Sequence, residues 1–403
     1  MDRRTFVAAA LSTLAAALAT LASALATLAA APAHAADFED FVESLRASAE
    51  QAGVRGEIFD SVARGLTQDP SLSGKRAAQS EFIRPLRAYV DDAASPSRAA
   101  HGHELREKYA APLRVVTAAS GAPGEMLVAL WGMESDFGRD HGDRDIFRTL
   151  ATLAFLHPDN PVYAQEFVAG LVLLQRGFPR EKLKGSWAGA MGDPQFMPSA
   201  YLKYARAFSG AGPADIWSSA PDTLASIGNF LKMSGWRPGQ PSLVEVKIPA
   251  NFAFATLKQD FSAWAQAGVA PLEGALPRRG EAMLFFPCGA EGPAFLLGEN
   301  FFVLKAYNFS DSYAFAAAIL ADRIAGRAVL RVAWPKEAQP LTLAEREAIQ
   351  RGLTAAGFYD GKIDGRFGPV TREAIHAFQR RAGIRQADGY PSRALLEALR
   401  KSE

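Results

Sequence analysis

Residues 123–138 read PGEMLVALWGMESDFG, and they predict a helix that carries a glutamate on an apolar surface. The helix is expected to begin near the proline and to end near the last glycine. Leu127, Leu130 and Trp131 stand seven, four and three residues before Glu134. Because these spacings bring side chains to one face of a helix, Glu134 is expected to share the inward-facing apolar stripe.

Glu134 has the surroundings that a general acid needs. Burial disfavours a charged carboxylate, and the last turn of a helix lies near the negative end of the helix dipole, so both effects are expected to raise the pKa of this side chain. A carboxyl group that stays protonated near neutral pH can protonate a leaving oxygen. The alternative is a glutamate that tilts toward solvent or pairs with an arginine, and the helix alone does not exclude it.

A second informative stretch, residues 186–201, reads SWAGAMGDPQFMPSAY. Its small residues permit close approach of the backbone, and Gln195 offers an amide donor and acceptor beside Phe196 and Met197. This mixture suits a sugar groove, in which apolar side chains pack on pyranose rings and amides bind N-acetyl groups. A tight turn between two helices is the alternative interpretation.

A third stretch, residues 307–313, reads YNFSDSY. It places Tyr307 and Tyr313 on either side of a helix start, with Ser310 as the expected N-cap. On its own this segment is equally well explained as a turn followed by a cap.

The composition is that of an ordinary globular protein. The chain has 403 residues, of which 49% are hydrophobic and 22% charged, with 44 basic against 43 acidic side chains and one cysteine. These figures exclude a disordered tail protein, a disulfide scaffold and a polybasic nucleic-acid binder, so no nucleic-acid partner is expected. The length predicts two or three folding units.

The N-terminus is interpreted as a signal peptide over residues 1–35. An uncharged stretch rich in Ala and Leu follows Arg3 and Arg4, and a small-x-small cleavage site lies at 33–35. The two arginines leave the Sec and twin-arginine routes open. An uncleaved anchor is the alternative, but no cysteine stands near the cleavage site to carry a lipid. We therefore expect a soluble periplasmic protein.

The rest of the chain is expected to be mainly α, in the α+β class. Residues 36–330 predict a helical domain with a small β-sheet excursion near its end, and residues 331–340 predict a linker. Residues 341–403 predict a compact three-helix module, which opens on the capping-box spacing of Thr342 and Glu345. Three short apolar runs are interpreted as strands of the excursion: residues 243–248, 283–286 and 301–304.

Together, the three stretches around Glu134, Gln195 and Tyr307 resemble lytic murein transglycosylases of the MltB type, over roughly residues 37–328. The C-terminal module is similar to the small peptidoglycan-binding domain, because it carries an Asp-Gly-x-Phe-Gly pattern at residues 364–368. These resemblances imply a lysozyme-like catalytic domain that acts on peptidoglycan glycan strands. Proteins of cell-wall synthesis or division are further partners that the sequence does not identify, and a monomer is expected.

The resemblance also implies a reaction and a catalytic residue. In this family the β-1,4 bond between N-acetylmuramic acid and N-acetylglucosamine is cleaved without water, and a 1,6-anhydromuramyl product forms. Glu134 matches the single acid/base of the family, and the N-acetyl group of the substrate takes the place of a second carboxylate. Two alternatives remain open at this point: a hydrolytic muramidase, and a non-catalytic peptidoglycan-binding protein.

The same resemblance implies substrate-binding positions in the groove. Ser186 is expected to hydrogen-bond near Glu134, and Gln195 to contact the sugar or its N-acetyl group. Phe230 stands where relatives commonly carry a tyrosine, so one hydrogen bond to substrate that the resemblance implies is not expected here. The implied substrate-binding residues are Ser186, Gln195, Asn229, Tyr307 and Tyr313.

No cofactor and no metal are expected. Some relatives carry a calcium-binding loop in the region that corresponds to residues 207–218, where this chain has Asp215 as its one carboxylate. Calcium needs several oxygen ligands, so this loop is not expected to bind it. The histidines form no ligand cluster in the sequence, and no cysteine joins them.

Overall fold

The structure is a computed structural model that describes residues 38–73, 84–335 and 340–402. The expected signal peptide and residues 336–339 of the expected linker lie outside the described residues. The chain divides into two compact units. Among the described residues, unit 1 comprises 38–73, 142–190 and 197–202, and unit 2 comprises 84–141, 191–196, 203–335 and 340–402.

Unit 1 is a cluster of helices with one short β-ladder. In its core, Phe147 of one helix packs edge-on against Phe167 of another at 5.8 Å between ring centroids. β1 (Arg144–Asp145) pairs antiparallel with β2 (Lys184–Gly185). The helices are α2 (Phe38–Ser44), α3 (Arg46–Gln51), α4 (Gly56–Ala63), α10 (Ile146–Leu156), α11 (Val162–Gln175), most of α12 (Pro198–Tyr204), and the short 3-10 turns Pro70–Leu72 and Arg180–Lys182.

A buried carboxylate holds the start of α12 in unit 1. Glu166 of α11 is 8% exposed and accepts two hydrogen bonds from Ser199, from the backbone N at 2.8 Å and from Oγ at 2.6 Å. Burial raises the pKa of Glu166, and the two bonds from Ser199 oppose that shift. The folded protein therefore holds the proton of Glu166 more tightly than the unfolded chain does.

This raised pKa predicts a pH-dependent stability difference. Between the unfolded and folded pKa values the native state binds more protons, so the contribution of Glu166 to stability falls as the pH rises from about 4 upward. Relative to a Glu166→Gln variant, the wild-type protein is expected to lose stability across that interval. Melting temperatures of both proteins from acid to neutral pH measure the effect. A difference that stays constant, or that grows in favour of the wild type, would contradict the assignment.

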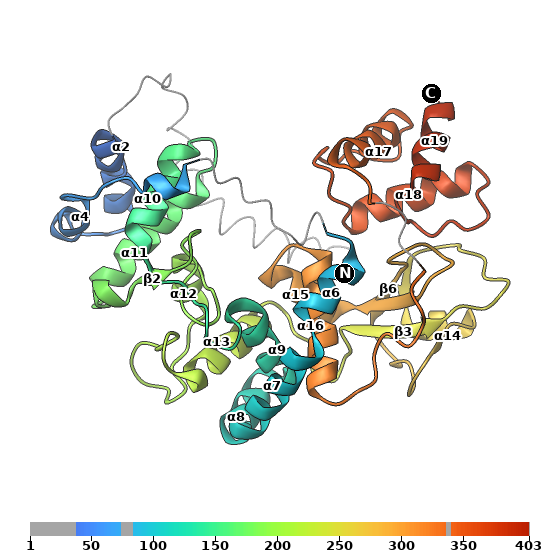
Figure 1. The fold of residues 1–403 in the computed structure, drawn as a ribbon, viewed down its shortest axis with the longest axis horizontal. Helices are drawn as coiled ribbons and strands as arrows, with labels where there is room; N and C mark the ends of the chain where they lie inside the picture. Colours follow the sequence, from blue (N-terminus) through green and yellow to red (C-terminus); the bar gives the residue numbers. More distant parts are fainter. Residues whose placement is uncertain (1–37, 74–83, 336–339, 403) are drawn as a thin grey trace, which may run out of the picture. The chain divides into compact units, whose positions relative to one another are not determined.

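Unit 2 contains the helix predicted from residues 123–138. This helix is α9 (Gly124–Ser135), and every residue from Met126 to Gly132 is buried in it. It contacts α7, α8, α13 and α16, so it lies at the centre of the helical part of unit 2 (Figure 1). The helices of this part are α6 (Leu86–Ala93), α7 (Pro96–Lys108), α8 (Ala110–Ser120), α9, α13 (Ala220–Met233), α15 (Glu299–Tyr307) and α16 (Asp311–Ile324).

The predicted β excursion is a five-stranded antiparallel sheet with the strand order β4-β6-β7-β3-β5. Its core contains the fully buried side chains of Trp264 and Phe261 from a short helix that follows β4. The elements are β3 (Leu243–Lys247), β4 (Lys258–Asp260), α14 (Phe261–Gln266), β5 (Ala270–Pro271), β6 (Glu281–Phe285) and β7 (Ala294–Gly298).

One predicted strand was wrong. Residues 301–304 lie in helix α15 and not in the sheet, whereas 243–248 and 283–286 contribute to β3 and β6. Phe301, Val303 and Leu304 are all buried. A short apolar run that is buried on several sides has the same sequence pattern in a strand and in a helix, so periodicity does not distinguish them.

The C-terminal residues form the three-helix module that the sequence predicts. The helices are α17 (Leu343–Ala355), α18 (Pro369–Arg381) and α19 (Arg393–Ser402). Thr342 and Glu345 form the expected capping box at the start of α17. Ile349, Leu353, Ile375 and other apolar side chains close the core. The mainly helical fold with a small sheet is therefore confirmed, and no helix in the described part of the chain is long and apolar enough to cross a membrane.

Candidate active site

Glu134 lies in the last turn of α9, as the sequence predicts. The helix ends at Ser135 because the next two residues, Asp136 and Phe137, take left-handed backbone conformations with φ of 48° and 61°. Glu134 is half-buried, and its Oε1 accepts a hydrogen bond from the hydroxyl of Tyr313. The alternative of a solvent-directed glutamate does not describe this arrangement.

Tyr313 and Tyr307 both face the charge of Glu134. Burial, and then the negative charge of Glu134, raise the pKa of each tyrosine well above its ordinary value. Their hydroxyls therefore stay protonated at neutral pH, so Tyr313 is the donor and Glu134 the acceptor. The hydroxyl of Tyr307 donates to the carbonyl oxygen of Pro194 at 2.7 Å. The structure thus brings together Glu134, both tyrosines and the loop that carries Gln195.

A Tyr313→Phe variant is expected to lower kcat for glycan cleavage about ten- to a hundredfold, because a hydrogen bond to a charged group contributes about 1.5–3 kcal/mol. The substitution keeps the ring in its buried position and removes only the donor to Glu134. Steady-state kinetics on a soluble glycan measure it, with Tyr163→Phe on α11 as the matched control. Unchanged kcat in the Tyr313 variant would show that the hydrogen bond has no part in catalysis.

Gln195 sits at the tip of a tight hairpin. Met191 and Phe196 pair across it through backbone hydrogen bonds of 2.8 and 3.0 Å, and Gln195 has a left-handed φ of 50°. Its amide nitrogen donates to the carbonyl oxygens of His141 at 3.1 Å and Gly192 at 2.9 Å. These bonds fix the orientation of the amide. The tight turn is therefore present, and the contact of Gln195 with substrate stays a prediction.

A buried polar network beside this hairpin was missed by the sequence analysis. Asp193 is 5% exposed, accepts from Trp131 Nε1 at 3.0 Å and pairs with His141 Nδ1 at 3.1 Å. Burial raises the pKa of Asp193, and His141 opposes the shift. A Cβ on Gly138 would lie 2.7 Å from the carboxylate, which explains the glycine there. The network ties the hairpin of Gln195 to the end of α9.

Asn229 and Phe230 lie on α13 with different roles. Asn229 Nδ2 donates to the carbonyl oxygen of Tyr204 at 2.8 Å. The ring of Phe230 packs against Tyr204 at 4.7 Å and against Tyr307 at 4.6 Å. Phe230 is therefore part of an aromatic cluster that supports Tyr307, and it has no hydroxyl to offer a substrate.

Ser186 belongs to unit 1, whereas Glu134 belongs to unit 2. The Ser186 Oγ accepts from the backbone N of Ala188 at 3.4 Å and of Ala190 at 3.3 Å, and the Ser186 N donates to the carbonyl oxygen of Ala190 at 2.7 Å. These bonds form a tight turn, as the alternative interpretation of this stretch proposed. The expected hydrogen bond between Ser186 and the surroundings of Glu134 stays a prediction.

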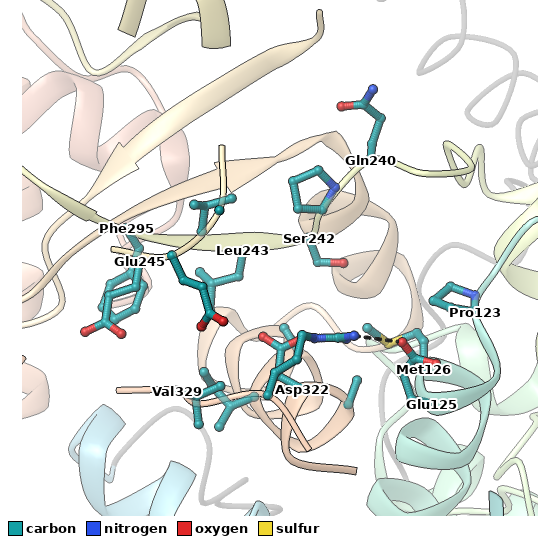
Figure 2. Close-up of a pocket in the computed structure, with 18 of the residues that line it drawn as sticks. Pro123, Glu125, Met126, Gln240, Ser242, Leu243, Glu245, Phe295, Asp322 and Val329 are labelled. Atoms are coloured by element: carbon teal, nitrogen blue, oxygen red, sulfur yellow. Dashed lines mark hydrogen bonds and ion pairs between the residues drawn. The ribbon is translucent and has the colours of Figure 1, made fainter. Parts of the chain in front are cut away.

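A large cavity of unit 2 is lined by Pro123, Glu125 and Met126 at the start of α9 (Figure 2), whereas Glu134 lies in the last turn of that helix. It measures about 790 Å³ and does not include Glu134 among its lining residues. Arg327 pairs there with Glu125 at 3.1 Å and with Asp322 at 2.8 Å. The wall of the cavity thus carries an ion-paired group of charges, and the candidate active site is defined by the chemistry around Glu134.

The loop at residues 207–218 is held by internal hydrogen bonds. The Asp215 carboxylate accepts from the backbone N of Trp217 and Ser218 and from the Ser218 hydroxyl, at 3.1, 3.0 and 2.5 Å. Within residues 38–73, 84–335 and 340–402, no three His, Cys, Asp or Glu side chains group together as a metal site would require. The carboxylate of Asp215 is thus occupied by the turn that it closes.

Comparison with known proteins agrees with this fold. The Transglycosylase SLT domain family matches residues 37–322, and the peptidoglycan binding domain family matches residues 342–399. Membrane-bound lytic murein transglycosylase B of Escherichia coli is 32% identical over 279 residues, 66% of this chain and 74% of that protein.

Two solved structures extend the comparison. SltB3 from Pseudomonas aeruginosa, in complex with NAG-anhNAM-pentapeptide, has a TM-score of 0.80 and 38% identity, covering 90% of this chain and 99% of that chain. The Escherichia coli lytic transglycosylase Slt35, in complex with calcium, has a TM-score of 0.59 and 28% identity, covering 72% of this chain and 92% of that chain.

The fold and the matched families are therefore those of a glycan-cleaving enzyme of the lytic transglycosylase class. Within that class, the chain belongs to the Transglycosylase SLT domain family and is a lytic transglycosylase of the MltB/SltB type. The resemblance drawn from the three sequence stretches is confirmed.

Proposed function

We propose that this enzyme cleaves the β-1,4 bond between N-acetylmuramic acid and N-acetylglucosamine of peptidoglycan without water and releases 1,6-anhydromuramyl products. Glu134 is the single acid/base in this proposal. The observation that carries it is the half-buried carboxylate of Glu134 at the end of α9, held by the hydroxyl of Tyr313.

Two proton transfers make up the reaction. Protonated Glu134 first gives its proton to the glycosidic oxygen, and the bond from that oxygen to C1 of the muramyl residue breaks. The C6 hydroxyl of the same residue then attacks C1, and its proton passes to the Glu134 carboxylate, which restores the acid. The N-acetyl group of the substrate stabilises the charge at C1, so no second carboxylate is required.

Tyr313 would assist both transfers by orienting the carboxylate. Its hydroxyl donates to Oε1, so Oε2 is the oxygen that we assign to the proton. A product complex of a relative supports the anhydro outcome, because SltB3 from Pseudomonas aeruginosa has been solved with NAG-anhNAM-pentapeptide.

The substrate-binding residues form the second part of the proposal. Tyr307 and Gln195 would line the subsites beside Glu134, because Tyr307 contacts the hairpin that carries Gln195. Asn229 would bind through its amide oxygen, since its nitrogen is engaged by Tyr204. Ser186 would complete the groove.

We also propose the domain roles and the location. Residues 1–35 would direct export to the periplasm and be removed, and residues 36–330 would form the catalytic domain. Residues 331–340 would connect it to residues 341–403, which would bind the peptidoglycan polymer. The protein would act as a monomer. Peptidoglycan strands are the expected partner, in line with the domain family that matches residues 342–399.

Mass spectrometry of products from purified sacculi tests the proposal. We expect muropeptides that end in 1,6-anhydromuramic acid. Reducing muramyl ends would identify a hydrolytic muramidase instead. Intact sacculi after prolonged incubation would favour a protein that binds peptidoglycan without cleaving it.

A further inference from the structure

The C-terminal module contacts the rest of unit 2 through a buried arginine. Arg372 of α18 has a side chain that is 15% exposed, and its guanidinium lies 4.6 Å from the centre of the Phe285 ring on β6. Its Nε lies 3.7 Å from Oδ2 of Asp311, which is 18% exposed. An arginine that is stacked on an aromatic ring and paired with a carboxylate has a defined orientation.

Asp311 is the first residue of α16, the helix that carries Tyr313. It is paired on its other side with Lys305 of α15 at 2.5 Å. The preceding residue, Ser310, accepts from the backbone N of Tyr313 at 3.3 Å and caps the helix. Asp311 and Tyr313 therefore belong to the same first turn, and the position of that turn determines where the tyrosine hydroxyl lies.

We propose that Arg372 is a positioning residue for catalysis, because its ion pair with Asp311 fixes the first turn of α16 and, through it, the Tyr313 hydroxyl that holds Glu134. The chain of contacts runs from the C-terminal module to the catalytic carboxylate in three steps: Arg372 to Asp311, Asp311 to Tyr313 within one helical turn, and Tyr313 to Glu134. The proposal rests on the proposed role of Glu134.

Other contacts hold the module without reaching α16. His376 Nε2 lies 2.8 Å from the carbonyl oxygen of Phe254, and Arg380 Nη1 donates to that of Ala255 at 2.6 Å. Asp388 Oδ2 accepts from the backbone N of Ala290 at 2.9 Å. All three partners lie in the β excursion. Arg380 on the same helix is therefore a matched control, because it ties α18 to the excursion but not to the turn of Tyr313.

The test uses the full chain and a soluble glycan, so that binding to an insoluble wall does not enter the rate. An Arg372→Met variant keeps the apolar stem on Phe285 and removes the charge. We expect kcat to fall about three- to tenfold with KM unchanged, which corresponds to a coupling of about 0.6–1.4 kcal/mol. The Asp311→Asn variant is expected to lose at least as much, since it weakens the pair with Lys305 as well.

The double variant gives the decisive comparison. Arg372→Met is expected to cause no further loss in an Asp311→Asn background, because the pair is already broken. Arg380→Met is expected to keep wild-type kcat. Full kcat in Arg372→Met, losses that multiply in the double variant, or an equal loss in Arg380→Met would each overturn the proposal.

Two further measurements keep the result unambiguous. Melting curves show whether Arg372→Met folds, and if it does not, Arg372→Lys retains the charge and should restore part of kcat. The rates of the variants are measured as total cleavage of the soluble glycan, whether the products are anhydro or reducing. Reducing products would therefore reject the proposed anhydro reaction while leaving the test of Arg372 valid.

Discussion

A Glu134→Gln variant is expected to lose glycan cleavage by about a thousandfold, because one side chain serves as both the acid and the base of the reaction. The amide has nearly the shape of the carboxyl group and can still accept from the Tyr313 hydroxyl, so the fold and the binding of glycan are expected to persist. Turnover of a soluble glycan and binding of the same glycan, measured on the same preparation, separate catalysis from recognition.

Asp136→Asn is the matched control for Glu134. Asp136 stands two residues further along, pairs with Arg98 at 3.4 Å and Arg139 at 3.6 Å, and has a φ of 48° that asparagine tolerates. Its removal changes one carboxylate near the end of α9 without touching Glu134. We expect kcat within about twofold of the wild type. Comparable losses in the two variants would mean that general electrostatics near the helix end matter, and not a specific acid/base.

The second large effect is expected on stability, at the start of the hairpin that carries Gln195. Gly192 has a φ of 61°, and a Cβ there would lie 2.6 Å from the carbonyl oxygen of Ile216. A Gly192→Ala variant therefore combines a left-handed backbone with a clash against main chain. We expect it to lose about 3 kcal/mol or more in free energy of unfolding.

Gly210→Ala isolates the contribution of the clash. Gly210 has a φ of 78°, but no atom lies within 4 Å of the Cβ position. This variant is expected to lose only about 1 kcal/mol in free energy of unfolding, because the strain comes from the backbone conformation alone. Chemical denaturation of both variants gives the difference directly. Equal losses would show that the close approach to Ile216 relaxes without cost, and that the hairpin is less rigid than its contacts indicate.

The elements of the fold were predictable wherever local chemistry specifies them. The helix over residues 123–138, the Ser310 cap and the capping box of Thr342 and Glu345 all follow from side chains within one or two turns, and all are confirmed. The error at residues 301–304 arose because burial on several sides removes the alternation that distinguishes a strand from a helix.

The contacts of the site were not predictable in the same way. Tyr313 and Glu134 are separated by 179 residues, and Asp193 and Trp131 by 62. Such pairs form because packed helices bring distant segments together, and no local spacing encodes them. The sequence therefore identified Glu134 and Tyr313 as candidates, but it did not show that one donates to the other, and it assigned no role to Asp193 or His141.

The contact between the C-terminal module and the β excursion was likewise not predictable from the sequence. The pattern of residues 341–403 predicted a compact helical module, yet Arg372 stacks on Phe285 of the β excursion and His376 lies against the carbonyl oxygen of Phe254. An arginine and a histidine on a helix ordinarily indicate a solvated face, so only tertiary structure shows their use as internal contacts.

The claim that a hydroxyl of the substrate replaces water is tested most directly by digestion in oxygen-18 water. If Glu134 directs the C6 hydroxyl to C1, products released by the wild-type enzyme carry no oxygen-18 at the muramyl C1. The Glu134→Gln variant releases almost no product. Incorporation of one heavy oxygen at each new muramyl end would show that water is the nucleophile and would contradict the account.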